Sequence, residues 1–116
     1  MGSPIAVFGS INMDLVIYSQ TKPMEGETIF GNSFETFQGG KGANQAVAIS
    51  KLGGDVAFIG KVGNDIFGQQ LKENLINEGV KTDMLFEHEG ESGVAFINVF
   101  GAESQNQIIV VPGANS

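Results

Sequence analysis

Residues 39–46 read Gly39-Gly40-Lys41-Gly42-Ala43-Asn44-Gln45-Ala46 and join an extended-looking segment to a run with helical periodicity. Glycines at such a junction permit positive φ angles and let backbone N–H groups approach a ligand closely. The residues that follow open a helix, whose first amide hydrogens have no partner inside the helix. The stretch is therefore suited to holding a small hydroxylated or phosphorylated molecule, but a plain glycine-rich turn explains it about equally well.

The residues before this stretch predict strands. Ile5–Gly9 is apolar at consecutive positions, which is typical of a buried parallel strand. The β-branched and aromatic residues 15–18 predict a second strand. Residues 28–38 predict one or two half-exposed strands around a turn at Gly31-Asn32.

The residues after the stretch predict a helix over 43–52, ended by Gly53-Gly54, and then a short strand over 56–59 that ends at Gly60. Small side chains let such a helix lie close to a sheet. Its apolar face comprises Ala43, Ala46, Val47, Ile49 and Leu52.

A second helix is predicted to begin at a cap formed by Asn64 or Asp65 and to end before Gly79. Its apolar side comprises Phe67, Leu71, Leu75 and Ile76. Residues 84–86, 94–100 and 107–111 predict further extended segments. The alternation of strands and helices favours an α/β fold with a parallel sheet and right-handed crossovers.

Composition excludes several classes of protein. The chain has 116 residues and a formal net charge of −7, which argues against a partner as anionic as nucleic acid. No apolar run is long enough to cross a bilayer, and no secretory signal is evident. With no cysteine, disulfides and thiolate metal sites are excluded, which is compatible with a cytoplasmic location.

The glycine-rich stretch matches neither common nucleotide-binding pattern. A P-loop requires Ser or Thr after its lysine, but Gly42 follows Lys41. The dinucleotide fingerprint fails as well, because Gln45 stands where its last glycine is required. Of the other candidates, Gly63-Asn64-Asp65 is explained by helix capping, and His88 has no partner histidine or cysteine and is interpreted as a surface residue.

Asn12 and Asp14 point to a different kind of ligand. They stand two residues apart just past the first predicted strand, and ligands of open α/β sheets bind at the carboxyl ends of strands. Residues at i and i+2 of an extended chain face the same way. Together they offer acceptors and donors suited to sugar hydroxyls, although a turn-forming pair is the simpler explanation when the two are taken alone.

Five segments follow one another along the chain: Gly9-Ser-Ile-Asn-Met-Asp14, Pro23-Met-Glu-Gly-Glu-Thr28, Phe37-Gln-Gly-Gly-Lys-Gly-Ala-Asn-Gln-Ala46, Leu52-Gly53 and Val62-Gly-Asn-Asp65-Ile-Phe-Gly68. In this order and spacing they resemble the motifs of the PfkB family of carbohydrate kinases, and in particular of its ribokinase-type members. The resemblance covers essentially the whole chain.

The resemblance implies a ribokinase-like α/β fold, in which a mostly parallel sheet with flanking helices carries a small β-sheet lid over the sugar. Residues 1–116 would form the N-terminal part of one such domain, with lid strands at about 15–38 and 94–100. The family's lid also mediates homodimerisation, which would explain apolar residues such as Ile17, Phe30 and Phe34 outside a core.

The family's functional positions transfer to this sequence residue by residue. The resemblance assigns sugar hydroxyls to Asn12 and Asp14, and the apolar side of the ring to the lid near Ala95 and Ile97. It assigns the sugar-contacting turn to Gly39, Gly40, Lys41 and Asn44.

The reaction implied is transfer of the γ-phosphoryl group of ATP to the 5-hydroxyl of ribose, with Mg²⁺ and a monovalent cation. Relatives carry a Gly-Ala-Gly-Asp anion hole, a catalytic aspartate and the nucleotide pocket in their C-terminal half, and residues 1–116 contain no such motif. The chain is thus expected to hold the sugar-binding half of a kinase site and to be inactive alone. A non-catalytic binding or dimerisation module and an inactive truncation product are the alternatives.

Overall fold

The computed structural model describes residues 3–116. Its helices are α1 (Lys41–Lys51), α2 (Ile66–Asn77) and the short 3-10 helix η1 (Gly113–Asn115). Its strands are β1 (Ile5–Phe8), β2 (Asn12–Ser19), β3 (Ser33–Gly39), β4 (Val56–Gly63), β5 (Leu85–His88), β6 (Gly93–Phe100) and β7 (Gln105–Val111). No helix among these residues is long and apolar enough to cross a membrane.

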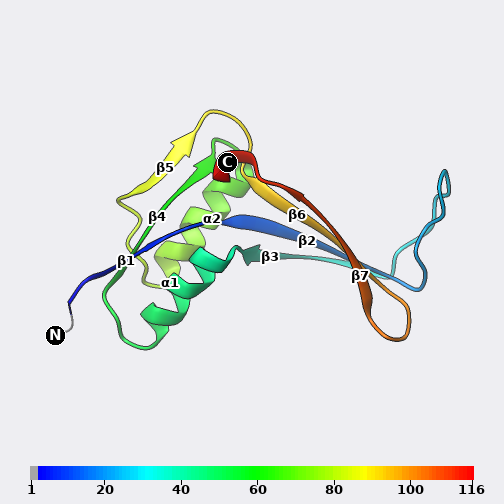
Figure 1. The fold of residues 1–116 in the computed structure, drawn as a ribbon, viewed down its shortest axis with the longest axis horizontal. Coiled ribbons are helices and arrows are strands. Elements are labelled where there is room, and N and C mark those ends of the chain that lie inside the picture. Colours follow the sequence, from blue (N-terminus) through cyan, green and yellow to red (C-terminus); the bar gives the residue numbers. More distant parts are fainter. Residues whose placement is uncertain (1–2) are drawn as a thin grey trace.

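Strands β1, β4 and β5 form a parallel sheet in the order β1-β4-β5, as the alternation of elements predicts. Helices α1 and α2 pack on one face of it (Figure 1). The core between sheet and helices is built from Val7, Phe58, Ala46, Leu71 and Leu75 with their neighbours. The close approach of α1 requires glycine at two positions, since a Cβ on Gly42 would lie 2.9 Å from the Cα of Gly9.

Both long helices end as the sequence predicts. Gly79 has a φ of +83°, and its N–H donates to the carbonyl of Ile76. The N–H of the next residue, Val80, donates to the carbonyl of Leu75, which completes a Schellman motif. Gly53-Gly54 closes α1 in the same way. Asp65 caps α2, because its Oδ1 accepts a 2.8 Å hydrogen bond from the N–H of Gly68.

A second, mixed sheet has the strand order β3-β2-β6-β7, with β2 and β6 parallel and the two outer pairs antiparallel. It extends away from the helices (Figure 1). The predicted lid strands at 15–38 and 94–100 fall in this sheet as β2, β3 and β6, and β7 adds a fourth strand that the expected lid did not include. Asn12 and Asp14 belong to β2 itself rather than to a turn.

Several boundaries differ from the sequence predictions. Helix α1 begins two residues earlier than position 43, and β4 continues through Gly60 to Gly63 because β5 pairs with its second half. Residues 28–30 are not in a strand. Leu52 and Ile76 are exposed, so the apolar faces of both helices are narrower than expected.

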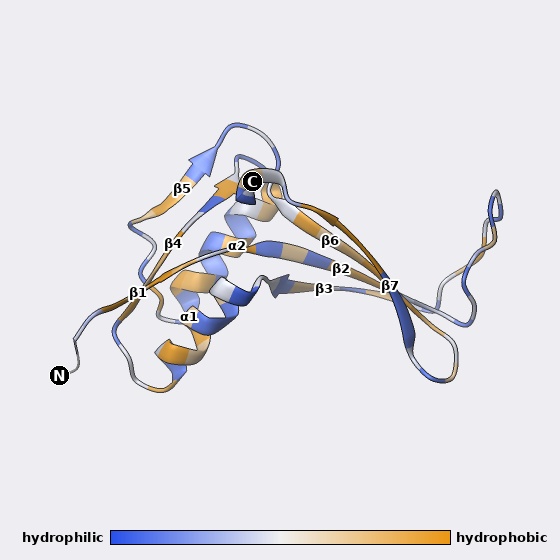
Figure 2. Cartoon of the chain, viewed as in Figure 1, coloured by the Kyte–Doolittle hydropathy of each residue, from blue (hydrophilic) through white to orange (hydrophobic). Residues whose placement is uncertain are grey.

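The prediction that the first strand is buried was wrong for most of its length. Val7 points to the helices and is buried, whereas Ile5 and Phe8 are 43% and 82% exposed. Phe8 is exposed because it faces away from the described helices, which cover a single face of the parallel sheet. Ile5 lies on the same face as Val7, at the exposed start of the strand. Hydrophobic residues make up β1 and the first half of β4 (Figure 2).

Candidate functional site

Asn12 and Asp14 form a hydrogen-bonded pair at the start of β2. The Nδ2 of Asn12 donates to the Oδ1 of Asp14 at 2.6 Å. Both side chains are half-buried, and their spacing along a strand places them on the same face, as predicted. The bond uses one donor of Asn12 and leaves its own carbonyl oxygen and the second oxygen of Asp14 available to other partners.

Strand register brings other predicted residues to this face. Asn12 pairs with Gly39 on β3 and Gly93 on β6, and Asp14 pairs with Ala95 on β6. Ile97 lies two residues further along β6 and therefore on the same face. The face thus carries polar groups at its base and apolar groups above them. We call the side chains of Asn12, Asp14, Ala95 and Ile97 with the backbone of Gly39 the β2 face.

Gly39 is required beside the pair for a steric reason. A Cβ at this position would lie 2.6 Å from both carboxylate oxygens of Asp14. Gly40 is required for two reasons, because its φ is +99° and a Cβ would lie 2.5 Å from the carbonyl oxygen of Ser10. The two glycines therefore turn the chain from β3 into α1 without displacing Asp14.

Lys41 and Asn44 occupy the first turn of α1, directly after this junction. Both are exposed. Gly40 is the N-cap and supplies no side-chain hydrogen bond. The N–H of Ala43 donates to the carbonyl of Ser10, which ties the helix start to the end of β1. The structure records no hydrogen bond or ion pair of the Lys41 or Asn44 side chain with the β2 face among residues 3–116.

Burial changes the ionisation of Asp14. Desolvation raises the pKa of this carboxyl above its usual value of 3.8, and the hydrogen bond from Asn12 opposes the shift without cancelling it. A carboxylate that has lost part of its hydration gains more from hydrogen bonds that a ligand donates to it.

A second polar network supports the base of β6. The carboxylate of Asp65 accepts hydrogen bonds from the N–H and Oγ of Ser92, at 2.8 and 2.6 Å. The Oγ of Ser92 in turn accepts a 2.8 Å bond from the N–H of Gly63. Ser92 is fully buried. The network joins the end of β4, the cap of α2 and the residue before β6, so the predicted capping role of Asp65 is confirmed.

Sequence reasoning missed two residues at this junction. Ser92 carried no recognisable signal, because a lone serine before a glycine is common in loops. Asn115 stood in a segment interpreted only as turn-forming. Its side-chain amide accepts from the N–H of Ile11 at 3.0 Å and donates to the carbonyl of Ile11 at 2.9 Å, immediately before Asn12.

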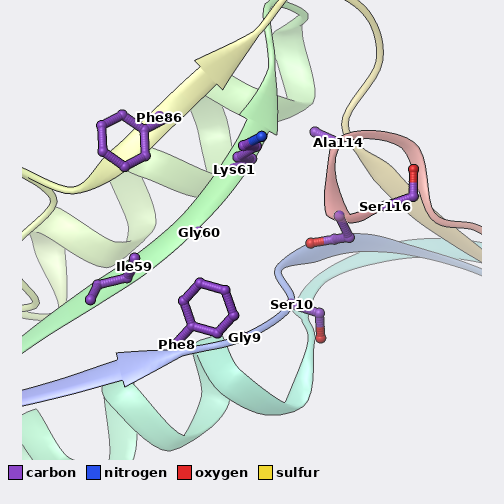
Figure 3. A pocket seen from close by; sticks show the side chains of 10 residues that line it. Phe8, Gly9, Ser10, Ile59, Gly60, Lys61, Phe86, Ala114 and Ser116 are labelled. Atoms are coloured by element: carbon purple, nitrogen blue, oxygen red, sulfur yellow. The ribbon is translucent and has the colours of Figure 1, made fainter.

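A cleft of about 530 Å³ opens on the uncovered face of the parallel sheet, beside the loop that leads to Asn12 (Figure 3). Phe8, Ile59 and Phe86 line one side, and Ser10 and Ser116 lie at its other end. Lys61 is its one charged residue. The cleft is therefore formed mainly by the uncovered face of the parallel sheet.

Residues 3–116 do not present a site that fits Mg²⁺. They contain no group of three or more His, Asp or Glu side chains that could hold a metal ion. His88 is exposed, as expected for a surface residue. What the β2 face does offer is the hydrogen-bonding capacity of the Asn12 amide and the Asp14 carboxylate.

A parallel α/β core that carries a second, mixed sheet is the arrangement of the ribokinase-like fold. The chain belongs to the pfkB family carbohydrate kinases, which match residues 3–116. A ribokinase of Bacillus subtilis (strain 168) is 50% identical over 113 residues, which cover 96% of this chain and 38% of the relative. A deoxyribokinase of Salmonella typhi is 45% identical over 112 residues, covering 96% and 36%.

A solved structure of Arabidopsis thaliana ribokinase complexed with ribose and ATP superimposes with a TM-score of 0.90 at 37% identity. The match covers 99% of this chain and 38% of that one. The chain therefore spans little more than a third of the length of the relatives it matches.

Proposed function

We propose that this chain supplies the sugar-binding part of a kinase that transfers the γ-phosphoryl group of ATP to the 5-hydroxyl of D-ribose. The observation that carries the proposal is the β2 face, where a hydrogen-bonded Asn12–Asp14 pair stands beside a glycine with no side chain to block it. Such a pair can accept hydrogen bonds from two sugar hydroxyls at once.

In this proposal Asp14 and Asn12 accept from ring hydroxyls, while Ala95 and Ile97 pack against the apolar side of the ring. Lys41 and Asn44 approach the sugar from the first turn of α1. Phosphoryl transfer depends largely on positioning, so holding the sugar fixed is a substantial part of the catalysis. Asp14 binds the substrate in this scheme and is not the base that receives the 5-hydroxyl proton.

ATP, Mg²⁺ and a monovalent cation are assigned to parts of the full-length enzyme outside residues 3–116. Bound ATP would supply the phosphoryl group, and the described residues would orient the acceptor. We further propose that the enzyme works in the cytoplasm, where ATP is available. Isolated residues 1–116 should then bind ribose without phosphorylating it.

A chimera tests this function. Residues 1–116 are joined to the part of the Bacillus subtilis ribokinase that lies beyond the matched segment, and ATP-dependent phosphorylation of ribose is measured. We expect activity in the chimera and none in residues 1–116 alone. A folded chimera that binds no sugar would contradict the proposal and favour a non-catalytic module.

The relatives include both ribokinases and a deoxyribokinase, so the sugar itself needs a direct comparison. Ribose carries a 2-hydroxyl that deoxyribose lacks. A site that hydrogen-bonds this hydroxyl rejects the deoxy sugar, because its polar groups are then left unpaired. We expect kcat/KM for ribose to exceed that for 2-deoxyribose, and the reverse order would reassign the substrate.

We propose a homodimer formed through the second sheet. Phe34, Phe96 and Ile109 lie on one face of it by strand register and are 60%, 41% and 66% exposed. Together with Val111, which lies two residues after Ile109 on the same face and is 42% exposed, they form an apolar patch that a second copy would cover. Sedimentation of the chimera should give a dimer, and Ile109→Glu should give a monomer. An unchanged mass in the variant would contradict this interface.

A further inference from the structure

The side chain of Asn115 makes two hydrogen bonds to the backbone of one residue, Ile11, where the chain passes from the parallel sheet to the mixed sheet. The N–H and the carbonyl of Ile11 both bond to its amide, at 3.0 and 2.9 Å. These residues are separated by 104 positions in the sequence. The chain passes from β1 to β2 at this point, so the contact fixes where β2 begins.

The surroundings of Asn115 leave it little freedom. A Cβ on Gly93 would collide with the Nδ2 of Asn115 and would lie 3.3 Å from the Cβ of Asn12. Gly93 therefore makes room for the Asn115 amide directly beside the β2 face. The N–H of neighbouring Ala114 donates to the carbonyl of Glu91, which anchors η1 next to the start of β6.

Ile11 transmits this constraint to the site. It is 1% exposed and belongs to the core, so its side chain is held by packing while its backbone is held by Asn115. The next residue is Asn12, whose side chain bonds to Asp14. A shift of Ile11 would move the polar pair relative to Gly39 and Ala95.

We infer that Asn115 is a positioning residue for sugar binding, which fixes the Asn12–Asp14 pair through the backbone of Ile11. This inference rests on the proposed function. It assigns Asn115 no contact with substrate. Because Asn115 acts through the orientation of sugar-binding groups, its loss weakens binding of the sugar and leaves binding of ATP unchanged.

The test uses the chimera and three variants. In Asn115→Ala, which loses both hydrogen bonds, KM for ribose should rise about tenfold while KM for ATP stays constant. Asn115→Asp keeps an acceptor for the N–H of Ile11 and should give a smaller rise. Asn106→Ala is the control, because Asn106 is an exposed asparagine of β7 that pairs with Val99, at the far end of β6 from Gly93.

A merely structural role would give a different result. Partial unfolding lowers the concentration of active enzyme, so kcat would fall with the folded fraction and KM for ribose would not change. That outcome would overturn the inference, and so would an effect of Asn106→Ala equal to that of Asn115→Ala.

Hydrogen exchange at Ile11 separates this inference from the proposed function. The Ile11 amide should be protected in the wild-type chain and in Asn115→Asp, and should exchange faster in Asn115→Ala. If the Ile11 amide is equally protected in Asn115→Ala, Asn115 does not position Ile11, whether or not the chimera phosphorylates sugar. A protected Ile11 in a chimera that phosphorylates no sugar would instead refute the proposed function.

Discussion

At the scale of single residues, the site depends on which side chain is absent as much as on which is present. Asp14 keeps its place because Gly39 contributes no Cβ to the space that its carboxylate occupies. The sequence showed that the glycines and the polar pair were suited to a small ligand. It could not show that Gly39 pairs with Asn12 and so lies against the carboxylate of Asp14, because that neighbourhood arises from the β2–β3 register.

Asp14→Asn should weaken ribose binding while raising stability. Loss of the charge removes a charge-assisted hydrogen bond, which costs roughly 10- to 100-fold in affinity. Because burial raises the pKa of Asp14 above 3.8, the ionised form destabilises the fold at pH values above the folded pKa. This penalty fades as the pH falls through the folded pKa toward 3.8.

Calorimetry with ribose and thermal unfolding at pH 7 and pH 4 check both parts of this prediction. The variant should have the higher midpoint temperature at pH 7, and the difference should shrink at pH 4. Glu35→Gln is the control, since it removes an exposed charge further along the same face. Unchanged affinity in Asp14→Asn would remove Asp14 from the site.

Gly39→Ala should weaken ribose binding by more than about tenfold. The new methyl group would lie 2.6 Å from the carboxylate oxygens of Asp14, which is too close, so the carboxylate must move. Gln38→Ala is the control, because Gln38 lies on the opposite face of β3, in a polar groove near Asn74 of α2. Calorimetry should show normal affinity in Gln38→Ala. Equal affinities in the two variants would argue against the steric explanation.

At the scale of elements, helix ends could be predicted from neighbouring residues, whereas features that depend on long-range contacts could not. The Schellman motifs after both helices and the cap at Asp65 follow from nearby residues, and the structure confirms them. Strand β4 was predicted too short, because its second half is fixed by pairing with β5, more than twenty residues away. For the same reason Ser92 and Asn115 escaped notice, since their partners are distant in the sequence.

The hydrogen bonds of the Asp65 carboxylate to Ser92 and Gly68 should stabilise the fold to an extent that depends on pH. Burial raises the pKa of Asp65, but hydrogen bonds from Ser92 and Gly68 outweigh it and hold the pKa below 3.8. A lowered pKa means that the ionised carboxylate stabilises the fold above pH 3.8, and that this contribution is lost as the pH falls through the folded value.

Asp65→Asn should therefore lower the free energy of unfolding by about 2 kcal/mol at pH 7. The amide oxygen can still cap Gly68, but the NH2 group cannot accept from the N–H of Ser92 and the charge is lost. The difference from wild type should narrow below pH 4. Urea unfolding at several pH values measures it, with Asp83→Asn, at an exposed position, as the control. A difference that does not depend on pH would mean that the charge of Asp65 contributes nothing.

At the scale of the whole molecule, the first strand shows what composition alone could not settle. Its consecutive apolar residues predict helices on both faces of the sheet, yet α1 and α2 cover one face and leave Phe8 exposed. The relatives are more than twice as long as this chain, so we expect the additional length to cover the other face in the full-length enzyme that we propose.

Phe8→Gln should therefore destabilise the chimera much more than residues 1–116 alone. In residues 1–116 alone Phe8 is 82% exposed, so the substitution should change the free energy of unfolding by less than about 0.5 kcal/mol. In the chimera, where added chain would bury the ring, the loss should be about 3 kcal/mol. Leu52→Gln, at an 88% exposed position at the end of α1, should be nearly neutral in both. Urea unfolding of the two proteins measures the contrast, and an equally small loss in the chimera would mean that this face stays open to solvent in the complete enzyme.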